Sequence, residues 1–299
     1  MKKILITGST GLLGQGLITN APHEYQIYAA SSKKYNHLHN SIIPVTFDIT
    51  NYSEVRGIID KVVPDVVIHA ASIGSVDFCE RQRNICKLVN VDGTKHLVNA
   101  CKKISSHFIY LSSNAIFDGK NPPYSELSAT NPVNYYGTTK LAGETLINSS
   151  GLNATIVRPV LMFGWNLSSQ RKNPATWIID ELRNDKTVRL VSDVFNNPVL
   201  NTDVARVIWE IIANKQLGIF HVAGYDRVSR YEFGLAVAKV FGLNSKLITS
   251  VTSNYFPEIA PRMPDTTYDT SYIKKMLGFS PRPLLEALEL MKNTEIIVT

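Results

Sequence analysis

A tyrosine and a lysine four residues apart have the types and spacing needed for proton transfer. Tyr136 and Lys140 form the only Y-x-x-x-K in the chain. On a helix, positions i and i+4 share a face, so the phenol and the ammonium would point into the same space. A nearby cation stabilises a phenolate and lowers the pKa of the tyrosine, which makes a proton donor and acceptor usable near neutral pH. An isolated pair at this spacing is most often structural, so its meaning depends on the motifs around it.

Two serines supply a further polar group for this pair. Ser112 and Ser113 end an apolar, β-rich run, and Asn114 follows them. Open α/β sheets bind their ligands at the carboxyl ends of the strands. A hydroxyl at that edge could hold a carbonyl oxygen beside Tyr136. We therefore predict that Ser113 is catalytic together with the Tyr136–Lys140 pair.

Three glycines near the start of the chain have the pattern G-x-x-G-x-x-G. They come directly after the apolar run Lys3–Thr7 and open a predicted helix. Glycine permits a tight turn and lets the backbone approach a pyrophosphate at the helix N-terminus. The placement of the loop, more than its spacing alone, predicts a dinucleotide site. The expected cofactor contacts in this loop are Gly8, Thr10, Gly11, Leu12, Leu13 and Gly14.

The ends of the next strands indicate which dinucleotide binds. A carboxylate after the second strand would bond the 2′-hydroxyl of the ribose and repel a 2′-phosphate. After the expected strand Tyr25–Ala30 the chain has two hydroxyls and two cations instead, which favours NADP(H) and leaves NAD(H) possible. A carboxylate after the third strand could bond the adenine amino group, and small residues after the fourth leave room for the cofactor. The predicted contacts are Ser31, Ser32, Lys33, Asp48, Ile49, Ala70 and Ala71.

Short apolar runs alternate with segments of helical length in the first half. Runs of this kind occur at Lys3–Thr7, Tyr25–Ala30, Ile42–Phe47, Val63–His69, His107–Ser112 and Ala154–Arg158. Helices are expected between them at Ser53–Val62, Ile85–Ile104 and Tyr136–Asn148. Strands separated by helices predict βαβ units in a Rossmann-type, doubly wound parallel sheet. We expect a dinucleotide-binding domain over 1–159, to which later segments can return, and a smaller C-terminal α/β substrate-binding domain over 160–299.

Composition excludes several other classes of protein. The 299 residues are 44% hydrophobic, the net charge is +6, and no apolar run reaches the length of a membrane span. The basic residues form no cluster, so nucleic acid is not an expected partner. His37 and His39 are not expected to bind metal, and the three cysteines lack C-x-x-C spacing, which favours buried thiols over a disulfide or zinc. We expect a cytoplasmic protein with no membrane partner and no metal.

Taken in order along the chain, these motifs resemble those of the extended short-chain dehydrogenases/reductases. The resemblance implies an NAD(P)-dependent oxidoreductase in which Lys140 also holds the nicotinamide ribose. Within that family, the chain is most similar to the reductases of dTDP-4-dehydrorhamnose. The segments that carry this similarity are 112–119, 134–144, Ala260 to Pro264 and Tyr268 to Ser271. They imply NADPH-dependent reduction of the 4-keto group of a nucleotide-linked 6-deoxysugar, with a homodimer as a possible assembly.

One departure from the reductase pattern bears on the substrate. Asn114 is neutral where the reductases typically have an acid, while Ser113 keeps the hydroxyl expected at its position. The resemblance implies that both residues contact the substrate and that Arg262 binds its diphosphate. Segment 112–124 also resembles the regulatory β-subunit of methionine adenosyltransferase, which implies a second hypothesis, a non-catalytic NADP-binding subunit. A nucleotide-sugar epimerase or dehydratase of the same family is a third.

Overall fold

A seven-stranded parallel sheet is the centre of the fold. The computed structural model describes residues 1–35, 42–256 and 260–295, and within them the strand order is β11-β6-β5-β4-β1-β2-β3. The order runs outward in both directions from β1 and β4, which confirms the predicted doubly wound sheet. The strands are β1 (Lys2–Thr7), β2 (Tyr25–Ser31), β3 (Ile42–Thr46), β4 (Val66–His69), β5 (His107–Leu111), β6 (Ala154–Pro159) and β11 (Gly218–Val222).

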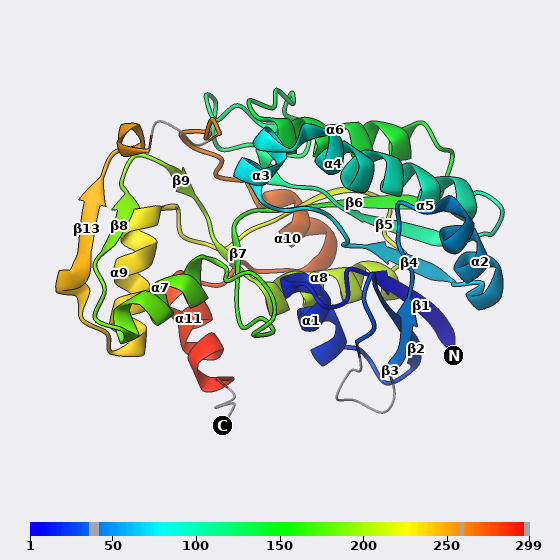
Figure 1. Cartoon of the computed structure of the whole chain (residues 1–299), viewed down its shortest axis with the longest axis horizontal. Helices are drawn as coiled ribbons and strands as arrows, with labels where there is room; N and C mark the ends of the chain where they lie inside the picture. The colour runs from blue at the N-terminus through cyan, green and yellow to red at the C-terminus, as the bar shows by residue number, and fades with distance from the viewer. Residues whose placement is uncertain (36–41, 257–259, 296–299) are drawn as a thin grey trace.

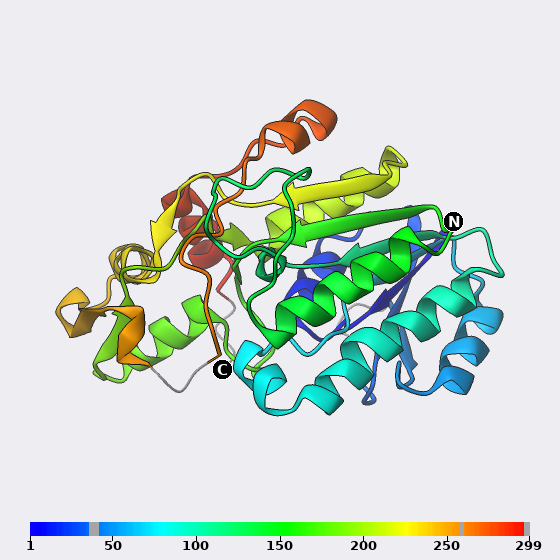
Figure 2. The ribbon, with the colours of Figure 1, turned by 90° about the horizontal axis from the view of Figure 1, so that it is seen from above.

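Both faces of the sheet are buried, because successive strand residues point into two different cores. Ile4 and Ile6 of β1 pack in one core with α1 (Leu12–Thr19) and α8 (Asn201–Ala213). Leu5 points the other way, into a core covered by three further helices. Figures 1 and 2 show the resulting three layers. The helices of the second face are α2 (Tyr52–Val62), α5 (Gly93–Cys101) and α6 (Tyr135–Asn148).

A smaller lobe lies beside the carboxyl ends of the strands, at the left of Figure 1. It has its own apolar core, which packs helices against the parallel pair β8 (Val188–Val191) and β13 (Ile248–Val251). Its helices are α7 (Pro174–Arg183), α9 (Arg230–Phe241) and α11 (Leu284–Asn293). The domain boundary after residue 159 stays a prediction, and both β11 and α8 come from beyond it to join the sheet. Shorter elements are β7 (Met162–Phe163), β9 (Phe195–Asn196), β10 (Val199–Leu200), β12 (Val228–Ser229), α10 (Ser271–Leu277), and 3-10 turns at Asn114–Ile116, Ser245–Leu247 and Ser253–Tyr255.

Two elements differ from the sequence-based boundaries by more than one or two residues or by an internal break. Val63 adopts a left-handed conformation with φ 47° and ends α2, so β4 begins three residues later than expected. The single helix expected over Ile85–Ile104 is divided into α4 (Arg83–Lys87), a π-helical turn over Leu88–Asp92, and α5. A π turn adds one residue to each hydrogen-bonded loop and shifts the face that the following helix presents. Apolar periodicity gives no signal for either break.

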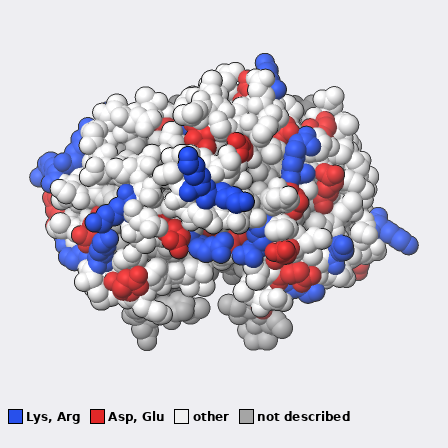
Figure 3. Space-filling model, turned by 180° about the vertical axis from the view of Figure 1, so that it is seen from behind, with Lys and Arg blue, Asp and Glu red and all other residues white. Residues whose placement is uncertain are grey.

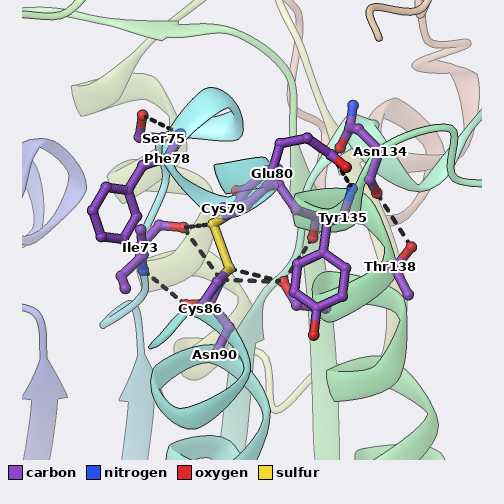
Figure 4. The surroundings of a disulfide bond; sticks show 12 residues. Ile73, Ser75, Phe78, Cys79, Glu80, Cys86, Asn90, Asn134, Tyr135 and Thr138 are labelled. Atoms are coloured by element: carbon purple, nitrogen blue, oxygen red, sulfur yellow. Dashed lines mark hydrogen bonds between the residues drawn. A yellow bond between two sulfur atoms is a disulfide. The ribbon is translucent and has the colours of Figure 1, made fainter. Parts of the chain in front are cut away.

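The expectation of three unpaired buried thiols is wrong for two of them. Cys79 in α3 (Val76–Arg81) and Cys86 in α4 form a disulfide whose Cα atoms are 5.2 Å apart, while Cys101 is free and buried. The chain breaks between the two short helices at Gln82, and α4 folds back against α3. That turn brings together two cysteines whose spacing matches no common motif. Figure 4 shows the disulfide facing α6, with Glu80 of α3 accepting a hydrogen bond from the Tyr135 amide at 2.9 Å.

The surface carries charges of both signs. Figure 3 shows lysines, arginines and acidic side chains interspersed on the face opposite that of Figure 1. None of the helices in the described residues is long and apolar enough to cross a membrane. Within the same residues, no group of three or more His, Cys, Asp or Glu side chains is arranged to hold a metal ion. His37 and His39 lie outside the described residues.

A buried ion pair ties α6 to the sheet. Two nitrogens of Arg158 in β6 bond the two carboxylate oxygens of Glu144 in α6, at 2.7 and 2.9 Å, and both side chains are almost fully buried. Removing one partner leaves an uncompensated buried charge. We expect Glu144→Gln to lower the free energy of unfolding, measured by urea denaturation, by about 3–5 kcal/mol.

The control for this prediction is an exposed ion pair on a helix. Asp60 and Arg56 are spaced i, i+4 in α2, and both side chains are about half exposed. Exposed pairs of this kind contribute about 0.3–0.5 kcal/mol, so Asp60→Asn should change the free energy of unfolding by no more than that. If the free energy of unfolding fell equally in the two variants, the buried Arg158–Glu144 pair would contribute no more to stability than the exposed pair.

Candidate active site

The glycine loop between β1 and α1 forms an anion cradle. Gly8 has φ +71°, and a Cβ built there would lie 2.7 Å from the Ala71 amide nitrogen, so only glycine allows the end of β4 to come this close. Gly11 is the N-cap residue of α1, and no side chain bonds the free amides at this end of the helix. The amides of the first helical turn therefore keep their capacity to bind an anion, and the helix dipole favours negative charge at that end.

An adenosine-sized pocket of about 470 Å³ adjoins this cradle. The structure brings together in it almost all of the residues predicted after β2, β3 and β4. Lys33 is the exception, because it is exposed beside the pocket and does not line it. Gln170, which follows β7 in the chain, also lines the pocket, and sequence motifs gave no signal for it. The predicted residues that line the pocket are Gly8, Thr10, Gly11, Ser31, Ser32, Asp48, Ile49, Ala70 and Ala71.

The helix α6, which carries the predicted Tyr136–Lys140 pair, begins close to the end of β5. Its N-cap Asn134 accepts a hydrogen bond from the Gly137 amide at 2.9 Å. A Cβ on Gly137 would lie only 2.0 Å from the carbonyl oxygen of Ala115, so this approach requires glycine. As a result, Ser113 and Tyr136 come within hydrogen-bonding reach of each other.

The electrostatics of the Tyr–Lys pair differ from the sequence-based expectation. Burial raises the pKa of Tyr136, and the opposing effect comes from a hydrogen bond with Ser113, not from Lys140. Burial also lowers the pKa of Lys140 to about 7, against the raising effect of Glu144. A lysine that is partly neutral near pH 7 provides less charge to a neighbouring phenol. Lys140 Nζ lies 4.5 Å from the centroid of the Tyr110 ring.

The predicted catalytic and substrate residues line one cleft of about 400 Å³, which also includes part of the glycine loop. Ser113, Asn114, Tyr136, Lys140 and Arg262 all belong to it. Two of these side chains, Asn114 and Arg262, already bond residues of distant segments. The Asn114 amide donates to the hydroxyl of Thr266 at 2.6 Å, and Arg262 pairs with Asp77 of α3 at 2.7 Å.

Arg230, at the start of α9, is a second arginine in this cleft, and sequence analysis missed it. Its Nη1 atom is buried, and no hydrogen-bond partner for it exists among the described residues. Burial and the charge of Arg262 lower its pKa to about 10. A buried guanidinium nitrogen without a partner is costly, and an anion bound in the cleft would compensate for it. Arg230 lies far along the chain from every recognised motif, so only the fold reveals it.

Arg230 and Arg262 also line an adjoining pocket of about 380 Å³ in the smaller lobe. Its walls combine aromatic and aliphatic side chains with three more cations, and no carboxylate is among the described residues that line it. Apolar walls suit a planar base, and cations suit phosphates. The aromatic and cationic side chains are Trp177, Phe233, Phe256, Arg171, Lys172 and Arg189, besides the two arginines.

A doubly wound sheet with a glycine-rich anion cradle, and a Ser–Tyr–Lys set at the carboxyl ends of its strands, defines an oxidoreductase of the extended short-chain dehydrogenase/reductase type. Residues 1–296 match the family described as RmlD substrate binding domain, and the chain belongs to that family. The family resemblance predicted from the sequence is thereby confirmed.

Individual relatives agree with this assignment. The chain is 28% identical to the dTDP-4-dehydrorhamnose reductase of Aggregatibacter actinomycetemcomitans, over 97% of this chain and 98% of that protein. It is also 28% identical to the methionine adenosyltransferase 2 subunit beta of Xenopus laevis, over 92% and 82% of the two chains. The crystal structure of the Bacillus anthracis dTDP-4-dehydrorhamnose reductase in complex with NADP has the same fold, with a TM-score of 0.87, 24% identity, and coverage of 99% and 100%.

Proposed function

We propose that the chain is an NADPH-dependent reductase of the 4-keto group of a nucleotide-linked 6-deoxysugar. The observation that carries the proposal is one cleft that joins three parts. The Ser113–Tyr136–Lys140 set lines it, the glycine cradle opens into it on one side, and the cationic aromatic pocket adjoins it on the other. This arrangement supports the activity named for the reductase relatives.

The residues of the first two parts fit a dinucleotide. The Gly8–Gly14 loop would hold the pyrophosphate, Asp48 the adenine, and Lys140 the nicotinamide ribose. Ser31, Ser32 and Lys33 offer donors near the ribose and place no carboxylate against a 2′-phosphate. A bound NADPH supplies the hydride for the ketone carbon, as the NADP complex of the Bacillus anthracis reductase supports.

The chain's own residues orient the ketone and supply the proton. Ser113 and Tyr136 would hold the ketone oxygen between their hydroxyls. As negative charge develops on that oxygen, Tyr136 donates its proton to it. Lys140 stabilises the resulting phenolate while it is protonated. Arg230 and Arg262 would bind the diphosphate of the substrate, and Trp177 and Phe256 offer faces for its base.

The methionine adenosyltransferase relatives support a second candidate, a regulatory NADP-binding subunit. The similarity over 92% of this chain is the observation that favours it. An assay of NADPH oxidation with a panel of nucleotide 4-ketosugars separates the hypotheses. Turnover supports the reductase, redox-neutral conversion supports an epimerase or dehydratase, and cofactor binding without any sugar chemistry contradicts both. The cytoplasmic location and the homodimer stay predictions.

The cofactor preference has a direct test in Lys33. The residue is exposed and follows Ser32, which lines the adenosine pocket. Titration calorimetry should show tighter binding of NADP(H) than of NAD(H). Lys33→Glu should shift the ratio of the two dissociation constants toward NAD(H) by about tenfold, because it brings a like charge beside the 2′-phosphate.

A second charge reversal is the control for this measurement. Lys61 is exposed in the last turn of α2, away from the adenosine pocket. Lys61→Glu changes the net charge by the same amount and should leave the ratio of dissociation constants unchanged. NAD(H) binding as tight as NADP(H) binding in the wild-type protein would contradict the proposed preference.

A further inference from the structure

Asn114 links the catalytic serine to a residue far along the chain. Its Nδ2 donates to Thr266 Oγ1 at 2.6 Å, and its Oδ1 accepts a hydrogen bond from Ser113 Oγ at 3.3 Å. The oxygen of Ser113 also accepts from the Ala115 amide at 3.2 Å, and Ser113 lies within hydrogen-bonding reach of Tyr136 in the same cleft. Hydrogen bonds therefore link Thr266 through Asn114 to Ser113, which lies beside Tyr136.

The amide of Asn114 suits this link because it has a donor at one end and an acceptor at the other. In the structure the amide nitrogen faces Thr266 and the amide oxygen faces Ser113. A carboxylate, the group expected from the reductase pattern, could only accept from both hydroxyls and would place a negative charge beside Ser113. Thr266 is 2% exposed, so water does not readily replace its hydroxyl as the partner of the amide.

The segment that carries Thr266 is itself held in place. The Thr266 amide donates to the Phe195 carbonyl at 3.0 Å, and the neighbouring Asp265 pairs with Arg227 at 2.7 Å. Asn134 makes a second link, since its Nδ2 donates to the Pro261 carbonyl at 3.0 Å while its oxygen caps α6. Segment 260–266 thus meets the catalytic residues through two asparagine side chains, and it also carries Arg262.

We propose that Asn114 is a positioning residue that, held by Thr266, sets the orientation of the Ser113 hydroxyl toward Tyr136 and the ketone. Ser113 has a single proton to donate. In the free protein that proton is directed to Asn114 Oδ1; when the ketone binds, the Ser113 O–H turns to the ketone oxygen, beside the O–H of Tyr136. Once Tyr136 has given its proton to the alkoxide, the Ser113 O–H can turn to the phenolate. Segment 260–266, which carries Arg262, would then also help to orient the hydroxyl groups around Tyr136, the proton donor. This inference rests on the proposed reductase activity.

The test compares two substitutions at Thr266. Thr266→Val removes the hydroxyl and keeps the shape, whereas Thr266→Ser keeps the hydroxyl. We expect Thr266→Val to lower kcat by about three- to tenfold, the usual worth of one neutral hydrogen bond, with the dissociation constant of NADPH unchanged. Thr266→Ser should restore kcat to near the wild-type value. Thr145→Val, on the exposed outer face of α6, is the matched control and should behave as wild type.

A readout that is independent of turnover separates this inference from the proposed function. The side-chain NH2 signals of Asn114 in 1H–15N spectra, assigned by their loss in Asn114→Asp, should be protected from exchange in the wild-type protein and in Thr266→Ser. They should lose protection in Thr266→Val. If no 4-ketosugar is turned over, the reductase proposal fails. These signals still test the hydrogen bond between Asn114 and Thr266. Unchanged signals or wild-type kcat in Thr266→Val would overturn the inference, as would a Thr266→Ser variant as impaired as Thr266→Val.

Discussion

Tyr136→Phe should lower kcat by about 10²–10⁴, the usual contribution of general acid catalysis. The substitution keeps the ring, the helix and the packing, and removes only the hydroxyl that would donate a proton to the ketone oxygen. The dissociation constant of NADPH should stay nearly unchanged, because the proposed cofactor contacts of the glycine loop and the adenosine pocket are untouched. Steady-state assays with the 4-ketosugar that the wild-type protein reduces, together with calorimetry for NADPH, measure both quantities.

The neighbouring tyrosine gives a matched control. Tyr135 is also in the first turn of α6, but its ring lies beside the Arg83 guanidinium and it does not line the catalytic cleft. Tyr135→Phe should therefore retain turnover. A Tyr136→Phe variant with near-wild-type turnover would mean that the Y-x-x-x-K motif is structural in this protein. The regulatory-subunit hypothesis predicts that neither substitution changes any sugar chemistry.

Lys140→Met should weaken NADPH binding and turnover while making the folded protein more stable. Lys140 is 3% exposed, and burial lowers its pKa in the folded state from 10.5 to about 7. Below pH 7 the lysine is charged in both states, and folding has to bury that charge. Above pH 10.5 the lysine is neutral in both states and the penalty is gone. Between these values the unfolded state binds more protons, so this group makes stability rise with pH.

Thermal melting of the two proteins across this pH range checks the sign. Near pH 7 the apo form of Lys140→Met should melt at a higher temperature than the wild-type protein. The difference should shrink as the pH approaches 10, because the wild-type protein loses its penalty there. A variant that melts lower than wild type, or a gap that widens with pH, would contradict this account. Tight NADPH binding by Lys140→Met would contradict the role proposed for Lys140 at the ribose.

The sheet and the loop motifs were predictable because they depend on neighbouring residues. Short runs such as Ile4 to Ile6 are apolar at every position, which indicates strands that are buried on both faces. The glycine loop and the Tyr136–Lys140 pair likewise combine residues only a few positions apart. Their place at the carboxyl ends of the strands then follows from the topology of a doubly wound sheet.

Features that depend on distant contacts or on local backbone strain could not be predicted from the sequence. Arg230 becomes a candidate anion ligand only because α9 places it in the cleft with its Nη1 unpartnered. Asn114 meets Thr266 across 152 positions of the chain. The left-handed conformation of Val63 is rare for a β-branched residue, and no propensity predicts it. The disulfide required a helix break at Gln82, which apolar periodicity does not reveal.

The cations of the cationic aromatic pocket would also affect how quickly the proposed substrate arrives. Arg171, Lys172, Arg189, Arg230 and Arg262 line one concave surface with apolar walls. Carboxylates of Asp180 and Asp77 offset the charges of Lys172 and Arg262, and the walls focus the field of the remaining charges into solvent. A diphosphate-bearing sugar is drawn toward this field before it makes any contact, so its association is faster than that of a neutral sugar of equal size. Dissolved salt screens the attraction over a Debye length of about 8 Å at physiological ionic strength. The efficiency of the enzyme at low substrate concentration is thereby linked to the ionic strength of its surroundings, whereas the chemical step inside the cleft is shielded from it.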